Sequence, residues 1–463
     1  PPSVFEPMLY RYRKHRGVNL GSWFILERWI TDRPYRFATA PGQSDLDIAR
    51  GPNARELLED HWDNWIVEDD WAWISERGMN AVRIPIGYYH LCGTDPSVLH
   101  ETAFHDLLPV FSSAWSRITK AIETANRYGL GVLIDLHAAP GKQNRDPHSG
   151  TSDPPMFFNS RRSRKHTTRI LCTLVKALNA YANSHRPPLA NIIGIELLNE
   201  PDPSSDTDLQ SWYISTIKAL REIDSTIPLY LGECWRTGQY ADFVQKMASP
   251  SLLVLDHHLY RCFTTLDNST TVHEHIKALS DSSAPTPQLF ARVTETLGRA
   301  GGGLVVGEWS GGLDPGSLSG KPGEQGEYVR TQVALYERYC GGWFFWTYKK
   351  QWAGDTGWSL RDSVGSGVKD KEKDQALGKV LSLVNVHIHL RPSEVHTSYW
   401  AQYPGKYEHW RFNDGFLKGW DAGYTFLDSS SQSDPYGRVT ELGFKGALAM
   451  KTTQDHGKSY WEY

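Results

Sequence analysis

The strongest constraint on this chain of 463 residues is a regular alternation between short apolar runs and longer segments with helical periodicity. The apolar runs are almost continuously hydrophobic, which is typical of strands that are buried on both faces. Eight of them follow one another along the chain. They cover residues 17–20, 80–86, 131–136, 192–198, 228–232, 252–259, 303–308 and 342–347.

The segments between these runs carry apolar residues three or four positions apart, the spacing of one face of an α-helix. Ile118, Ile122 and Ala125 follow this spacing, as do Leu289 and Val293. Eight strands alternating with helices, without a dinucleotide-binding fingerprint after the first strand, favour a closed (β/α)8 TIM barrel of the α/β class. An open doubly wound sheet is the alternative.

The alternation is complete by about Leu360, and the rest of the chain has a different character. We therefore predict a catalytic barrel over residues 1–364 and a C-terminal extension over residues 365–463. The extension is rich in aromatic residues, and a helical stripe is formed by Trp410, Leu417, Trp420, Tyr424 and Leu427. We expect a helical extension packed on the barrel, with an accessory sugar-binding surface as the alternative.

Composition excludes several classes of protein. Lys and Arg number 49 against 53 Asp and Glu, a net charge of −4, which excludes a nucleic-acid binder that works by bulk positive charge. No apolar run approaches the roughly 18 residues of a membrane span. Five widely spaced cysteines do not suggest a disulfide framework. The compartment stays open, with a cytoplasmic location favoured over a secreted or cell-wall-associated one, and we expect a monomer.

Polar residues end several of the predicted strands, and in a barrel these ends meet at the face that carries active sites. They are Arg83, His137, Asn199, Glu200, His258, Tyr260, Glu308 and Trp346. Strands four and seven thus each supply a carboxyl group. Two facing carboxyl groups can cleave a glycosidic bond, one protonating the departing oxygen and the other attacking the sugar or activating water. For attack by the second carboxylate, we expect the pair to lie about 5 Å apart.

Local sequence supports this placement. Pro201 disfavours helical backbone at Glu200 and removes a hydrogen-bond donor, so strand four must end there and let Asn199 and Glu200 both face the barrel mouth. His258 and Tyr260 are two positions apart and point the same way on extended backbone. The intervening histidine points away and is predicted to be structural.

The motifs Asn199-Glu200-Pro201 and Gly307-Glu308-Trp309-Ser310, in this order on strands four and seven, resemble glycoside hydrolase family 5. The segment Arg16-Gly17-Val18-Asn19-Leu20-Gly21-Ser22-Trp23-Phe24 is similar to the fungal exo-β-1,3-glucanase branch of that family. The similarity spans most of residues 10–360. It implies a retaining mechanism in which Glu200 is the acid/base and Glu308 the nucleophile.

The resemblance also implies supporting roles around this pair. Arg83 and Tyr260 belong to the surroundings of the nucleophile, and Asn199 binds the sugar 2-hydroxyl. His137 and His258 form the floor of the sugar site.

Three further residues complete the substrate-binding set that the resemblance implies. Trp346 is the platform under the sugar ring, and Glu27 matches a position that holds the terminal glucose, with a solvated charge as its alternative. Asp146 lies in the loop after strand three, which is close to that of the branch. Arg28 stands where this branch usually has proline, and we identify no counterpart for the extension.

The two glutamates need opposite protonation states. Arg83 and the Tyr260 hydroxyl are expected to keep the pKa of Glu308 low, as a nucleophile requires. Glu200 must carry a proton, so its pKa is expected to be raised by an apolar setting and by the nearby negative charge. Hydrolysis by two carboxyl groups needs no metal, and we expect no metal and no cofactor.

The sequence therefore predicts a retaining glycoside hydrolase that releases glucose from β-glucosides, acting from the chain end on β-1,3-glucan. A β-glycosidase for small aryl, lipid or disaccharide-linked glucosides is the alternative with the same chemistry. A non-catalytic carbohydrate-binding barrel is the alternative of another class.

Overall fold

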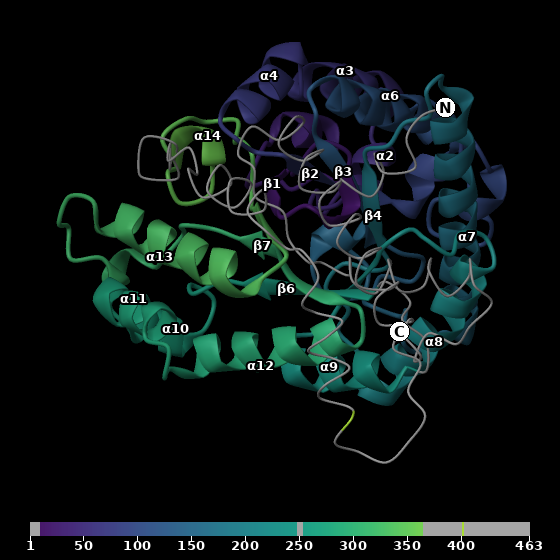
Figure 1. Ribbon diagram of the computed structural model, residues 1–463. Helices are drawn as coiled ribbons and strands as arrows, with labels where there is room; N and C mark the ends of the chain where they lie inside the picture. The colour runs from purple at the N-terminus through teal and green to yellow at the C-terminus, as the bar shows by residue number, and fades with distance from the viewer. Residues whose placement is uncertain (1–9, 248–252, 364–400, 402–463) are drawn as a thin grey trace.

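The computed structural model describes residues 10–247, 253–363 and 401, and it contains a closed barrel of eight parallel strands. The strands pair in sequence order, and β1 closes the barrel against β8. Figure 1 shows the strands inside a ring of helices. The strands are β1 (His15–Asn19), β2 (Ala81–Gly87), β3 (Gly131–Ala138), β4 (Ile192–Glu196), β5 (Leu229–Gly232), β6 (Leu253–Leu259), β7 (Gly303–Trp309) and β8 (Gly342–Phe345).

The helices are of two kinds. Long amphipathic helices cover the barrel, namely α3 (Ala54–Trp65), α4 (Glu68–Glu76), α6 (Ala114–Arg127), α7 (Arg161–Ser184), α8 (Asp206–Arg221), α9 (Thr237–Lys246), α11 (Val272–Ser280), α12 (Pro285–Arg299) and α13 (Glu324–Tyr339). Shorter ones lie within the connections, namely α2 (Asp45–Ala49), α5 (Leu108–Phe111), α10 (Thr265–Ser269) and α14 (Leu360–Ser363). Of the described helices, none has the length and apolar character needed to span a membrane.

The predicted TIM barrel is confirmed, and each of the eight apolar runs forms a strand. The boundaries differ where the site is built. β4 ends at Glu196 instead of residue 198, and β8 ends at Phe345 instead of residue 347. The residues that follow these two strands leave the strand ladder, and their side chains lie at the barrel mouth. The C-terminal extension and its aromatic stripe lie outside the described residues.

The barrel interior is layered. Leu133 and Val254 belong to a small apolar cluster that fills one end of the barrel, together with Ala81, Ile193, Tyr230, Val305 and Phe344. Alternate residues of a strand face the same side, so the residues two and four positions beyond Leu133 on β3 also point inward. They are Asp135 and His137. An apolar plug thus lies beneath a charged layer, and the charged layer lies beneath the mouth.

A β-bulge brings Glu308 into this arrangement. Val305 belongs to the interior cluster and Val306 to the layer between strands and helices, so strict alternation would turn Glu308 outward with Val306. The register of β7 shifts against both neighbouring strands, and Glu308 becomes the partner of His258. A bulge of this kind re-aims a side chain, and here it turns Glu308 toward the mouth.

The close packing of the interior predicts that Gly17 cannot be enlarged. A Cβ atom at Gly17 would lie 2.1 Å from Cδ1 of Phe344. Gly17→Ala should therefore lower the free energy of unfolding by about 1–3 kcal/mol, measured by chemical denaturation. Gly298→Ala is the matched control, because a Cβ atom there meets nothing within 4 Å, and it should cause no loss. Equal stability of the two variants would contradict the packing described.

Candidate active site

The eight polar residues predicted from the sequence come together at the mouth of the barrel, with Arg83 at their centre. Arg83 was predicted to end its strand, but it lies inside β2 and reaches the others from the charged layer below. The Arg83 guanidinium is fully buried. Its Nη1 atom donates to Glu308 Oε1 at 2.8 Å, and its Nη2 atom donates to Asn199 Oδ1 at 2.9 Å. Below these contacts, Nη2 lies 3.2 Å from Asp135 Oδ2 and 2.6 Å from Glu196 Oε2. One cation therefore holds a candidate nucleophile and a candidate sugar-binding amide in fixed positions.

Glu308 and Glu200 face each other across the mouth. The Tyr260 hydroxyl donates to Glu308 Oε2 at 2.9 Å. His258 Nδ1 lies 2.7 Å from Glu200 Oε1 and 3.4 Å from Glu308 Oε2, so one imidazole nitrogen contacts both carboxyl groups. An oxygen atom of each glutamate and this nitrogen all lie within 4.8 Å of one another. This separation is smaller than the roughly 6.5–9.5 Å of an inverting pair of carboxyl groups and suits direct attack by one of them.

The backbone at Glu200 is strained. Its φ is +41°, in the left-handed region that residues other than glycine rarely adopt. Pro201 disfavours right-handed helical backbone at the preceding residue, which agrees with the predicted break of the strand. Gln143 Nε2 donates to the carbonyl of Asn199 at 3.1 Å, and Asn144 Nδ2 donates to the carbonyl of Glu200 at 3.0 Å. These bonds from the loop after β3 hold the unusual conformation in place.

Burial raises the pKa of both glutamates. The pKa of Glu308 rises to about 7, although His258, Arg83 and the Tyr260 hydroxyl oppose this rise. The sequence-based expectation of a low pKa at Glu308 is thus wrong in direction: the expected partners are present, but burial has the larger effect. The pKa of Glu200 is raised by burial as well, and Asp146 adds to the rise. Because the two carboxyl groups interact, the pKa values observed in a titration describe the pair as a whole and not either residue alone.

The electrostatic surroundings still distinguish the two carboxyl groups. Arg83 donates directly to Glu308, whereas the charge of Asp146 opposes ionisation of Glu200. His148 and Arg83 oppose the rise at Glu200, as His258, Arg83 and the Tyr260 hydroxyl oppose it at Glu308, so the two carboxyl groups have different neighbours.

His137 fixes the orientation of the Asn199 amide. His137 Nδ1 lies 2.5 Å from Asp135 Oδ2, and its Nε2 lies 3.2 Å from Asn199 Nδ2. A proton on Nδ1 leaves Nε2 to accept from the amide, while Arg83 donates to the amide oxygen. The ring of His137 stacks on Trp346, with centroids 5.9 Å apart and an interplanar angle of 12°. The predicted floor and platform residues are thus neighbours.

The Glu27 carboxyl group interacts with the charges of Glu200 and Glu308. The alternative hypothesis, that Glu27 is a solvated surface charge, is therefore wrong. Trp29 Nε1 donates to Glu27 Oε2 at 2.7 Å. Burial, together with the charges of Glu308, Glu200 and Asp146, raises the pKa of Glu27 to about 8, although the hydrogen bond from Trp29 opposes the rise. Glu27 Oε1 is buried and has no hydrogen-bond partner within the described part of the chain.

Sequence analysis did not single out four residues of this region. Asp135, Glu196 and Asp256 are the buried carboxyl groups beneath the mouth, and Asp256 Oδ2 lies 3.9 Å from Arg83 Nε. A signal was available for two of them, because Asp135 and Asp256 each stand two positions before a selected histidine. The fourth is His148, in the loop after β3, where no strand or helix periodicity points to it.

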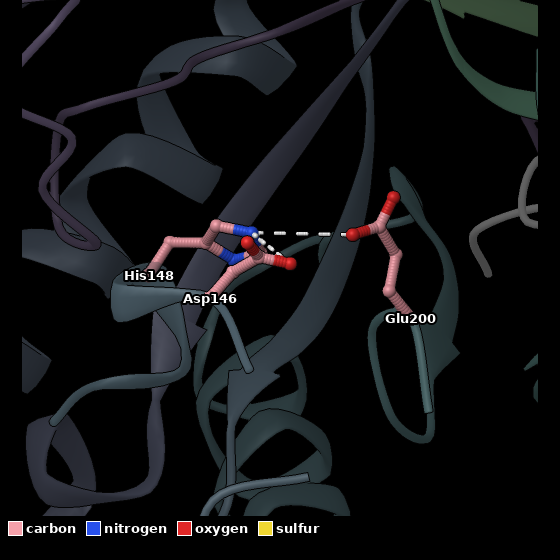
Figure 2. A group of neighbouring side chains, drawn as sticks. All are labelled: Asp146, His148 and Glu200. Carbon is pink, nitrogen blue, oxygen red and sulfur yellow. Dashed lines mark ion pairs between the residues drawn. The ribbon is translucent and has the colours of Figure 1, made fainter. Parts of the chain in front are cut away.

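One ring nitrogen of His148 faces the carboxyl groups of both Asp146 and Glu200, as Figure 2 shows. Its Nε2 atom is 3.8 Å from Asp146 Oδ2 and 3.9 Å from Glu200 Oε2. Three groups of carboxylate and imidazole atoms in the described residues are close enough to hold a metal ion: Asp146, His148 and Glu200; Glu196, Asp256 and His258; and Glu200, His258 and Glu308. The ion pairs and hydrogen bonds given above already account for most of these contacts.

The fold and the paired carboxyl groups at its mouth define the class of a glycoside hydrolase. Comparison with known families agrees. The model of the cellulase family, glycosyl hydrolase family 5, matches residues 53–351. The chain belongs to glycosyl hydrolase family 5 and is a glycosidase.

Related proteins share most of the chain. Glucan 1,3-beta-glucosidase 3 of Schizosaccharomyces pombe is 30% identical over 98% of this chain and 94% of its own length. An uncharacterized glycosyl hydrolase of Saccharomyces cerevisiae is 30% identical over 88% of this chain and 80% of its own. The crystal structure of rutinosidase from Aspergillus niger superposes with a TM-score of 0.63 at 16% identity, covering 77% of this chain and 98% of that one, and supports the fold.

The C-terminal segment also has a relative. The family model described as the glucan 1,3-beta-glucosidase 3 C-terminal domain matches residues 387–463. Sequence analysis identified no counterpart for this segment, and this finding supplies one.

The raised pKa of Glu27 predicts a measurable effect on stability. A carboxyl group with a raised folded-state pKa stabilises the fold at low pH, and this contribution is lost as the pH rises from about 4.5 toward about 8. Glu27→Gln removes the titration. Its melting temperature relative to the parent should therefore rise progressively between pH 4.5 and pH 8. A difference that is constant across this range would contradict the burial of an ionisable group here.

Proposed function

We propose that the protein is a retaining β-glucosidase that releases glucose from the ends of β-1,3-glucan chains. The observation that carries this proposal is the separation of Glu200 and Glu308, whose nearest oxygens lie within 4.8 Å. A double displacement needs such close carboxyl groups, whereas an inverting reaction needs a wider gap for water. The names of the related glucan 1,3-beta-glucosidases support the choice of linkage.

In the first step, Glu308 attacks the anomeric carbon while Glu200 donates its proton to the departing oxygen. The hydrogen bonds that Glu308 accepts from Arg83 and from the Tyr260 hydroxyl stabilise its anion before attack. Bond formation to the sugar then removes the charge of Glu308. The pKa of Glu200 falls in response, and in the second step its carboxylate takes a proton from water, which releases glucose with retained configuration.

The surrounding residues bind the sugar in this proposal. Asn199, held by Arg83 and His137, binds the 2-hydroxyl, and Trp346 supports the ring from below. Glu27 binds hydroxyls at the non-reducing end, and its buried, unpartnered oxygen supports that role. All of these groups come from one chain, which is consistent with a monomeric enzyme.

Product analysis tests the function directly. The purified protein should release glucose from laminarin, and the β-anomer should appear first when the reaction is followed by NMR. Initial release of the α-anomer would overturn the retaining mechanism. Turnover of aryl, lipid-linked or disaccharide-linked glucosides without turnover of laminarin would favour the small-glycoside alternative. Binding of laminarin without release of reducing sugar would favour the non-catalytic barrel.

Alanine variants of the two glutamates should differ in a way that assigns their roles. Glu308→Ala should abolish turnover of every glucoside, because no covalent intermediate can form. Glu200→Ala should slow the first step with laminaribiose by about 100-fold or more, yet affect an activated aryl glucoside much less, because its leaving group needs little protonation. Pre-steady-state rates of aglycone release measure this step. Equal losses with the two kinds of substrate would contradict the assignment of Glu200 as the acid.

A further inference from the structure

Helix α7 lies in a segment of unusual charge. Residues 154–195 contain seven Lys and Arg and no Asp or Glu, although the whole chain has a net charge of −4. Six of these seven basic residues are in α7, which has no acidic residue in its first turn. One helix therefore carries six positive charges and no negative ones in a chain whose net charge is negative.

Five of the six basic side chains lie on one face of α7. Each residue of an α-helix advances by about 100°, so these five fall within an arc of about 100°. All five are exposed, and we call them the basic stripe: Arg161, Arg162, Lys165, Arg169 and Lys176. The sixth, Arg164, lies outside this arc and donates to the carbonyl of Phe158. The opposite face of α7 buries apolar residues such as Ile170 and Leu174 against the barrel, so the stripe faces outward.

The folding of α7 does not explain the basic stripe. The N-terminus of a helix carries a partial positive charge, which favours acidic side chains in the first turn and disfavours Arg161 and Arg162 there. By contrast, α4, α8 and α13 each begin with acidic residues. Arg161, Lys165 and Arg169 are four positions apart, so their like charges repel one another along the helix. The stripe thus lowers the stability of the helix that carries it, which points to a role in binding.

The stripe is largely without acidic partners. Among the residues that the structure describes, Arg162 is the one member with an ion pair, which it makes with Glu101. Asp95 interacts with the charge of Arg169, but its carboxylate accepts hydrogen bonds from Thr173 and from the backbone of residue 97 instead. Most of the positive charge of the stripe is therefore available to a partner.

The shape of the stripe suits a flat anionic surface. It extends over about 22 Å of a straight helix on the outer, convex side of the barrel. A bilayer surface can contact such a ridge along its whole length, and basic residues on one face of a helix are attracted to anionic lipid headgroups. Nucleic-acid binding relies on an element that enters a groove or on aromatic side chains that stack on bases, and no member of the stripe is aromatic.

We propose that the basic stripe binds the surface of a bilayer that contains anionic phospholipids, so that the protein associates peripherally with membranes. α7 follows β3, and in a barrel the helix that follows a strand begins at the mouth face. The stripe therefore starts at the rim of the mouth and holds the mouth beside the bilayer. This inference does not depend on which glycoside the enzyme hydrolyses.

Vesicle sedimentation tests the proposal with the full chain. The protein should sediment with vesicles of phosphatidylcholine and phosphatidylserine and should not sediment with phosphatidylcholine alone. Raising the salt from about 0.1 M to about 1 M should release it, because the screening length falls from roughly 10 Å to 3 Å. Combining Arg161→Gln, Lys165→Gln and Arg169→Gln should weaken binding about 100-fold, at about fivefold for each cation.

The matched control removes the same charge from the other side of the barrel. Lys277, Arg330 and Arg338 are exposed on α11 and α13, which Figure 1 shows on the opposite side from α7. Replacing these three with Gln should leave vesicle binding unchanged. Because the stripe substitutions remove repulsion within α7, the melting temperature of that variant should not fall. Should the triple variant fail to fold, Lys165→Glu alone should still weaken binding at least fivefold.

Three results would overturn the proposal. The first is that the parent protein does not sediment with the anionic vesicles, or sediments equally with the neutral ones. The second is an equal loss of binding in the stripe variant and in the control, which would indicate a response to net charge alone. The third is binding to a single-stranded RNA without binding to vesicles. Each result leaves the proposed glycosidase function intact, because glucose release is measured separately on soluble substrates.

Discussion

The interaction on which the site depends is the buried ion cluster around Arg83. Its guanidinium contacts the carboxyl groups of Glu308, Asp135 and Glu196, with Asp256 slightly farther away. Buried charges are costly unless they are paired, and a guanidinium with several fixed donors can pair with several partners at once. The same group that neutralises the charged layer therefore also orients the candidate nucleophile. Stability and catalysis are joined at this one side chain.

The barrel brings its chemistry together by a departure from regular strand geometry. Alternation alone would point Glu308 away from the mouth, and the bulge in β7 corrects this. Gly307 permits the arrangement, because a Cβ atom there would lie 2.0 Å from Asp256 Oδ1. After β4 the corresponding departure is the left-handed backbone of Glu200, which the loop after β3 holds through its side-chain amides. Both glutamates are thus presented by irregular backbone on a regular scaffold.

Much of this could be predicted from the sequence, for physical reasons. Strands buried on both faces leave continuous apolar runs, and polar residues at the ends of such runs stand out, as Glu200 and Glu308 did. His148 could not be found this way, since its position depends on how a loop folds back over the mouth. The raised pKa of Glu308 was also missed, because the degree of burial is a property of the whole barrel and outweighs the contacts that motifs reveal.

The site draws its side chains from strands that are distant in sequence and adjacent only once the barrel is closed. Arg83 on β2, Glu200 after β4 and Glu308 on β7 contact one another or a shared neighbour across the ring of strands. No fragment shorter than residues 83–308 contains Arg83 and both glutamates. Because these strands become neighbours only in the closed barrel, hydrolytic activity in a refolding experiment would report closure of the barrel.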